Sequence, residues 1–174
     1  MWILDIFCSF FSRSLIVFRV GSPWPGFNLA HIFRRTDKTH MQDPIENLYY
    51  ALGELAFAVA SADGSIQQEE KKRFQQIIND ALKRQNYHYE ISHIVFQLMN
   101  KEKPDTKTTY DWAMNVIKVN SHYLSPTMKE TFIHVMKAIA EAYPPVTIDE
   151  KKVIDLFKKD IAPLKGDPVY YSPQ

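Results

Sequence analysis

Cysteine and glycine are scarce in this sequence, and the scarcity of each excludes a class of protein. Only one of the 174 residues, Cys8, is a cysteine. The chain can therefore form neither an intrachain disulfide framework nor a cysteine-based zinc site, which fits a reducing compartment. From residue 41 to residue 174 the only glycines are Gly53, Gly64 and Gly166. This part of the chain therefore has no phosphate-cradling loop and no dinucleotide-binding fingerprint.

Several features that an enzyme or a nucleic-acid-binding protein would need are also missing. The sequence has no H-E-x-x-H motif, and His88 and His93 are five positions apart, so a helix would not place them on one face for joint metal ligation. The adjacent carboxylates Glu69 and Glu70 would point in different directions on a helix, and no nucleophile is identified near them. The formal net charge is only +1, and lysines alternate with acidic residues rather than forming a basic stripe. We therefore expect neither an enzyme nor a partner of nucleic acid.

The first 40 residues differ in composition from the rest of the chain. They hold five basic and two acidic residues, against sixteen basic and eighteen acidic residues in the remainder. Their apolar run is interrupted by Asp5 and Arg13 before it reaches the roughly twenty residues that span a bilayer, and no signal-peptide cleavage site follows it. Three interpretations stay open: a leader before a true start at Met41, an amphipathic arm that contacts a membrane, and a signal or anchor. Membrane contact through residues 1–40 is not the favoured one.

From Met41 onward the apolar residues recur at helical spacing, and no convincing strand pattern competes. Asp43, Pro44 and Glu46 form a helix start directly after that methionine. Further prolines fall between the helical segments, where they are tolerated. The sequence predicts an all-α fold, a compact bundle of about six or seven helices over residues 41–161. The predicted segments are 44–62, 65–84, 88–101, 106–121, 126–143 and 148–160.

The stretch ASADGSIQQEE fits the second half of an EF-hand calcium loop but not the first half. Asp63, Gly64 and Glu70 stand at the required offsets, whereas the acidic residues that open such a loop are absent. Asp63, the carbonyl of Ser65 and Glu70 would supply about half of the six to eight oxygens that calcium takes. The same residues also suit a helix turn, with Gly64 in the left-handed conformation and a capping box of Ser65 and Gln68. Both interpretations stay open: a weak divalent-cation site and a capped turn.

A second helix start resembles the first one. Placing DGSIQQEEKK over PVTIDEKKVI sets Ser65 opposite Thr147, and Thr147 with Glu150 predicts a second capping box. The pattern indicates a repeated helical hairpin, with chance similarity between two capped helix starts as the alternative. The second copy lacks the Asp-Gly pair. Any ion chemistry should therefore be concentrated at the first turn or shared with Asp149 and Glu150.

The segment ELAFAVASADGSIQQEEKKRF resembles the signature of the tellurite-resistance TerB-like family: an alanine-rich helix, then A-D-G-x-I, then acidic residues that open the next helix. The resemblance extends over residues 41 to about 161 in length and helix number. It implies a compact, non-enzymatic helical domain of a stress-response assembly, cytoplasmic in most settings and also found fused to J-domain co-chaperones. It further implies a divalent-metal site at the acidic turn, here Asp63, Glu69 and Glu70, with calcium or magnesium bound weakly and no other cofactor.

Residues 162–174 form a short tail that combines three prolines with Tyr170 and Tyr171. Such a tail can dock onto a protein partner or fold back over its own domain, and the second outcome is the expected one. A protein partner is expected for the helical module, although the sequence does not indicate which one.

Overall fold

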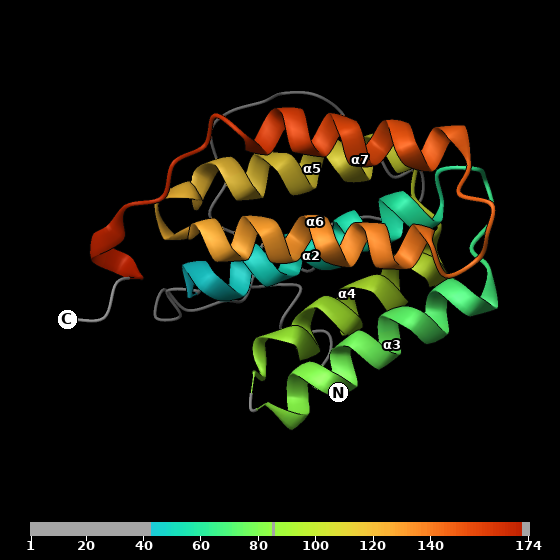
Figure 1. Ribbon diagram of the computed structural model, residues 1–174, viewed down its shortest axis with the longest axis horizontal. Helices are drawn as coiled ribbons and strands as arrows, with labels where there is room; N and C mark the ends of the chain where they lie inside the picture. The colour runs from blue at the N-terminus through green and yellow to red at the C-terminus, as the bar shows by residue number, and fades with distance from the viewer. Residues whose placement is uncertain (1–42, 85, 172–174) are drawn as a thin grey trace, which may run out of the picture. The chain divides into compact units, whose positions relative to one another are not determined.

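The computed structural model describes residues 43–84 and 86–171, and this part of the chain is all-α, as predicted. The chain divides into two compact units, residues 1–43 and residues 44–174. The predictions for residues 1–40 lie outside the described residues. Within those residues there is no strand, and two short 3-10 helices, η2 and η3, follow α5 and α7. The elements are α2 Pro44–Ala60, α3 Gln68–Lys83, α4 His88–Glu102, α5 Thr106–Val119, η2 Ser121–Tyr123, α6 Pro126–Ala140, α7 Ile148–Ile161 and η3 Pro168–Tyr170 (Figure 1).

Helix α2 lies at the centre of the second unit, where it packs against α4, α5, α6 and α7. Every residue from Leu48 to Ala60 is buried. Gly53 allows α4 to come close, because a Cβ at this position would lie only 2.4 Å from the backbone oxygen of Ser92. The hydroxyl of Ser92 in turn donates a hydrogen bond to the backbone oxygen of Tyr49 at 2.6 Å. The small residues of α2 thus determine how tightly its neighbours approach.

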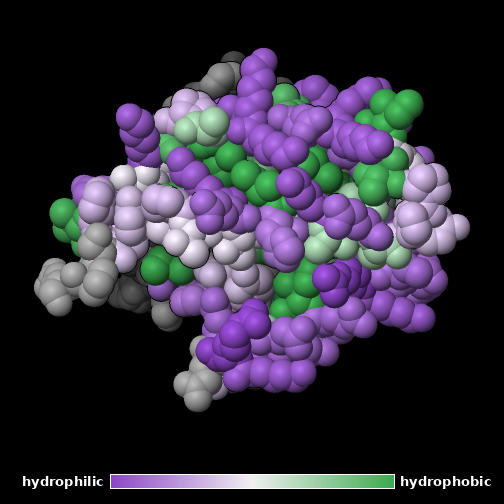
Figure 2. Space-filling view, viewed as in Figure 1, coloured by the Kyte–Doolittle hydropathy of each residue, from purple (hydrophilic) through white to green (hydrophobic). Residues whose placement is uncertain are grey.

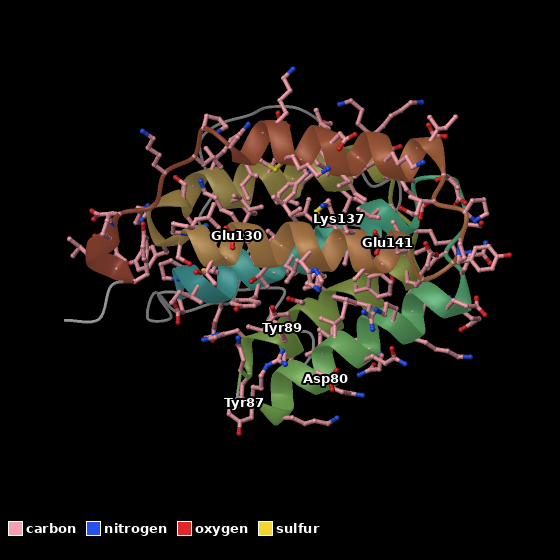
Figure 3. All side chains as sticks on the ribbon, in the orientation of Figure 1. Asp80, Tyr87, Tyr89, Glu130, Lys137 and Glu141 are labelled. Carbon is pink, nitrogen blue, oxygen red and sulfur yellow. The ribbon has the colours of Figure 1, made fainter. Side chains whose placement is uncertain are left out.

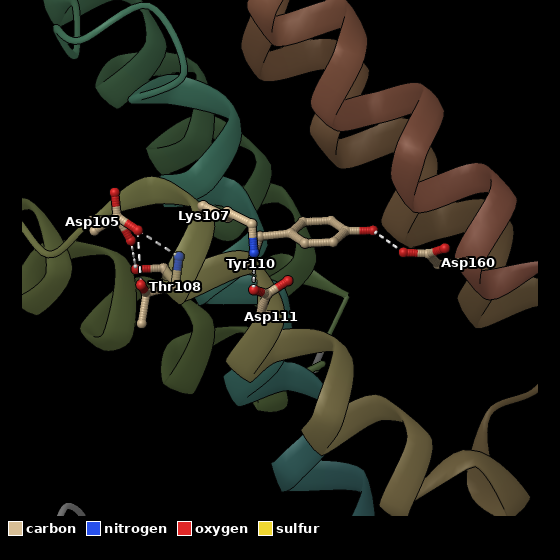
Figure 4. A network of polar contacts seen from close by, with 7 residues as sticks. Asp105, Lys107, Thr108, Tyr110, Asp111 and Asp160 are labelled. Carbon is tan, nitrogen blue, oxygen red and sulfur yellow. Dashed lines mark hydrogen bonds and ion pairs between the residues drawn. The ribbon is translucent and has the colours of Figure 1, made fainter. Parts of the chain in front are cut away.

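Polar contacts set the start of α5 and tie it to α7 (Figure 4). The carboxylate of Asp105 accepts hydrogen bonds from the backbone nitrogen and the hydroxyl of Thr108, both at 2.8 Å. One turn further along, the hydroxyl of Tyr110 donates to the carboxylate of Asp160 on α7, also at 2.8 Å. The first contact is a local helix cap, whereas the second joins two helices that are far apart in the sequence.

The predicted helices agree with the observed ones except at some of their ends. The segment predicted over 65–84 begins at Gln68, because the side chain of Asp63 accepts a hydrogen bond from the backbone nitrogen of Ser65 at 3.0 Å and holds that residue in the turn. The segments predicted over 44–62 and 126–143 end earlier, at Ala60 and Ala140. Each of these last residues is followed by a turn that continues the hydrogen bonding for only a few residues.

The tail folds back on its own domain as far as Tyr171, the second of the two alternatives given by the sequence. The backbone nitrogen of Asp167 donates to the backbone oxygen of His122 at 2.8 Å. The ring of Tyr170 lies 4.3 Å from that of Tyr123 and 5.6 Å from that of His122, measured between centroids. The tail is therefore part of the folded unit and covers the region around η2.

Hydrophilic residues cover much of the face shown in Figure 2. On α6 the exposed residues include Glu130 and Lys137, with Glu141 directly after the helix, and all three are labelled in Figure 3. The opposite side of α6 buries Phe132 and Met136 in the core. In the described ranges, no helix combines the length and the apolar character that crossing a membrane requires.

Replacing Gly53 by alanine should destabilise the packing of α2 against α4. The new Cβ would overlap the backbone oxygen of Ser92, which cannot move away without shifting α4. We expect the free energy of unfolding to fall by about 1 to 3 kcal/mol, measured by urea denaturation of the full chain. As a control, Gln76→Ala on the exposed side of α3 should change the free energy of unfolding by less than about 0.5 kcal/mol. Equal stability of Gly53→Ala and the wild type would mean that the two helices are not this close.

Candidate functional site

The two acidic turns predicted from the sequence lie at the same end of the helical unit (Figure 1). One turn connects α2 to α3, and the other connects α6 to α7. Glu70 follows the first turn and Glu150 follows the second, 80 positions later in the sequence. The structure therefore brings the two halves of the predicted repeat together.

The first turn has the conformation that its sequence predicts. Gly64 has a φ of 95°, in the region that favours glycine, and its nitrogen donates to the backbone oxygen of Ser61 at 3.0 Å. The carboxylate of Asp63 is exposed and accepts the hydrogen bond from the nitrogen of Ser65. One oxygen of Asp63 therefore already stabilises the turn.

The start of α3 is capped by Glu70 rather than by the predicted pair of Ser65 and Gln68, so that prediction is wrong. Glu70 is only 3% exposed, and its Oε2 accepts a hydrogen bond from the backbone nitrogen of Gln67 at 2.6 Å. Glu70 stands three residues after Gln67, at the position from which a glutamate side chain reaches back to the nitrogen that precedes a helix. This explains why the cap forms at Gln67, two residues after the predicted position.

The start of α7 carries the capping box that the sequence predicts. The Oε2 of Glu150 accepts from the nitrogen of Thr147 at 2.6 Å and from its hydroxyl at 2.7 Å, and the same hydroxyl oxygen accepts from the nitrogen of Glu150 at 3.2 Å. Glu150 is also 3% exposed. Its equivalent in the first hairpin is Glu70, so the predicted alignment has to be shifted by two positions, with Gln67 opposite Thr147.

The carboxyl groups of Glu70, at the start of α3, and Glu150, at the start of α7, are close enough for each to affect the other's proton. Burial raises the pKa of Glu70 to about 7; the hydrogen bond from Gln67 opposes this increase, and the charges of Glu150 and Asp63 add to it. Because the pKa of Glu70 is about 7, protonation of this carboxyl depends on pH near neutrality.

The other predicted site residues do not take part in this contact. Glu69 and Asp149 are both exposed, and Asp149 forms an ion pair with Lys152 at 2.7 Å. Over the ranges that the structure describes, no group of three or more histidine, cysteine, aspartate or glutamate side chains is arranged to hold a metal ion. The structure thus joins Glu70 and Glu150 with Asp63 nearby, and the divalent cation at this turn stays a prediction.

A further buried carboxyl, Glu54 on α2, is not singled out by the sequence analysis. It is 6% exposed, and its Oε2 has no hydrogen-bond partner among the described residues. Burial raises the pKa of Glu54 to about 8, so this carboxyl is protonated at neutral pH. One signal in the sequence could have revealed it, because Glu54 is the only charged residue between Asn47 and Ala62.

Comparison of the chain with models of protein families, with curated proteins and with solved structures finds no match. The resemblance to the TerB-like family thus depends on the alanine-rich helix and the acidic turn of this sequence.

The free energy of unfolding should fall as the pH rises from about 4.5 to 7, in part because of Glu70. Its pKa is about 7 in the folded chain and near 4.5 without the fold, so in this range the folded state binds more protons than the unfolded state. This contribution is fully present below pH 4.5 and is lost above pH 7. We expect a decrease on the order of 1 to 3 kcal/mol in urea denaturation at a series of pH values.

Glu70→Gln should flatten this dependence, because the neutral amide imitates the protonated carboxyl and does not titrate. Glu69→Gln, a change at the exposed neighbouring position, should keep the wild-type dependence. Glu54 should cause a separate decrease in the free energy of unfolding that extends to about pH 8, and Glu54→Gln should remove this decrease. If the free energy of unfolding of Glu70→Gln and of the wild type changed with pH in the same way between pH 4.5 and 7, a buried carboxyl pair would be contradicted.

Proposed function

We propose that residues 44–171 form a non-enzymatic, TerB-like helical module that binds a protein partner in a cytoplasmic stress-response assembly of the tellurite-resistance type. In this proposal the paired acidic turns bind a divalent cation weakly, and the cation competes with the proton on Glu70. The single observation that supports it is the contact between Glu70 and Glu150, which joins the acidic turns of the two hairpins.

The chemistry of the pair suits exchange between a proton and a cation. Carboxylate oxygens are the ligands that calcium and magnesium take in proteins, and two carboxylates with the nearby Asp63 supply part of a coordination shell that water can complete. Binding requires Glu70 to lose its proton, so the affinity should rise with pH. A site with so few protein ligands would be weak, with a dissociation constant of about 0.1 to 1 mM.

The second candidate function is a purely structural interaction domain that binds a protein without metal. It is favoured by the hydrogen bonds that the pair already makes, because Glu70 and Glu150 each accept a backbone N–H at 2.6 Å. In this case the protonated pair simply connects the starts of α3 and α7. Tyr143 and Ile148, which are 49% and 72% exposed in the turn before α7 and at the start of that helix, offer apolar contacts to a partner at the same end.

Titration of the full chain with calcium, magnesium and zinc, by calorimetry and by NMR, distinguishes the two candidates. The cation model predicts saturable binding that is at least several-fold stronger at pH 8 than at pH 6, because Glu70 is ionised only at the higher pH. Glu70→Gln and Glu150→Gln should abolish it, and Asp63→Asn should weaken it.

Glu69→Gln is the matched control, since it removes an adjacent, exposed carboxylate and should leave cation binding unchanged. Shifts of the NMR signals should centre on the two turns. A flat titration of a chain with a well-dispersed spectrum would reject the cation site and leave the structural interaction domain.

A further inference from the structure

A groove of about 470 Å³ lies between α3 and α6, with the start of α4 at one side. Figure 2 shows apolar side chains between α6 and α3 with strongly hydrophilic ones on either side of them. In Figure 3 the labelled residues Asp80, Tyr89 and Glu130 extend from α3, α4 and α6, and all three line this groove. None of the predicted site residues is among those that line it.

The groove contains both arginines of the folded part of the sequence. Residues 41–174 have sixteen basic residues, of which only Arg73 and Arg84 are arginine, and both line the groove. Neither takes part in an ion pair among the described residues. A guanidinium group binds a carboxylate through two parallel hydrogen bonds, a geometry that lysine cannot offer.

The spacing of the two arginines defines what can bind there. Arg73 lies in the first half of α3 and Arg84 directly follows its last residue, Lys83, eleven positions later, so the two are on the order of 16 Å apart along the helix axis. Between them lies Ile77, which is half-buried, and Val135 of α6 faces it across the groove. The groove therefore has an apolar centre at Ile77 and Val135 within a mostly polar lining, and an arginine that forms no ion pair with the described residues stands toward each end.

We propose that this groove binds an acidic peptide segment of a partner protein. In an extended peptide, residues i, i+2 and i+4 point to one side and span about 13 Å, and the flexible arginine side chains cover the remaining distance. Acidic side chains at i and i+4 contact Arg73 and Arg84, and an apolar side chain at i+2 packs on Ile77. This inference depends on the proposed partner-binding role but not on the cation site.

Two carboxylates that line the groove affect how tightly it can bind an acidic peptide. Asp80 is paired with Lys83 at 3.1 Å, so its charge is largely compensated. Glu130 makes none of the ion pairs of the described chain, and it stands on the α6 wall of the groove. An acidic peptide is repelled by Glu130, so removal of this charge should strengthen binding.

The test uses the full chain and a fluorescein-labelled peptide, GESLSEG, followed by fluorescence polarisation at low salt. We expect saturable binding that weakens as salt is added, with Arg73→Gln and Arg84→Gln each reducing the affinity about five- to tenfold. Lys72→Gln is the matched control: it removes the same charge from the adjacent, exposed position and should change the affinity less than about twofold. The peptide GQSLSQG, without carboxylates, should not bind.

Two more variants distinguish this site from the paired turns. Glu130→Gln should increase the affinity for GESLSEG, and Glu70→Gln should leave it unchanged, so a failed cation titration and a failed peptide titration are separate results. The proposal is overturned if GESLSEG shows no saturable binding up to about 1 mM, or if Lys72→Gln weakens binding as much as Arg73→Gln does.

Discussion

The packing of α2 inside the bundle is the constraint on which the other features depend. Thirteen consecutive residues of this helix are buried, and Gly53 lets the backbone of α4 come closer than any larger residue would allow. The chain then leaves α2 through the turn at Gly64 and enters α3, while α6 and α7 pack around the same central helix. This arrangement sets the starts of α3 and α7 beside each other, and the contact between Glu70 and Glu150 follows from it.

That contact combines two roles in the same side chains. Each carboxyl caps the helix that carries it, and the pair also joins two hairpins that are distant in the sequence. Burying two carboxyl groups is unfavourable when both are charged, and burial together with the charge of Glu150 raises the pKa of Glu70 to about 7. The same geometry therefore serves a structural role, and under the proposed function it also serves a regulatory one.

Helix α3 contributes to both candidate surfaces. Its first turn supplies Glu70 to the paired turns, its exposed face supplies Arg73 to the groove against α6, and Arg84 directly after the helix lines the same groove. The two surfaces differ in chemistry, because one is a buried acidic contact and the other is an open groove whose arginines form no ion pair with the described residues. Glu54 belongs to neither surface, and its burial in α2 raises its pKa to about 8.

The sequence by itself determined those structural features that depend on residues close together in the chain. Helical periodicity, the positive φ of Gly64 and the capping box of Thr147 with Glu150 follow from interactions a few positions long, and they could be predicted. The cap at Gln67 could not be, since several residues of the first turn compete for it. Only the tertiary structure decided that Glu70 meets Glu150, that Glu54 is buried with one oxygen unpartnered among the described residues, and that two arginines line the groove against α6. These features depend on how whole helices pack against one another.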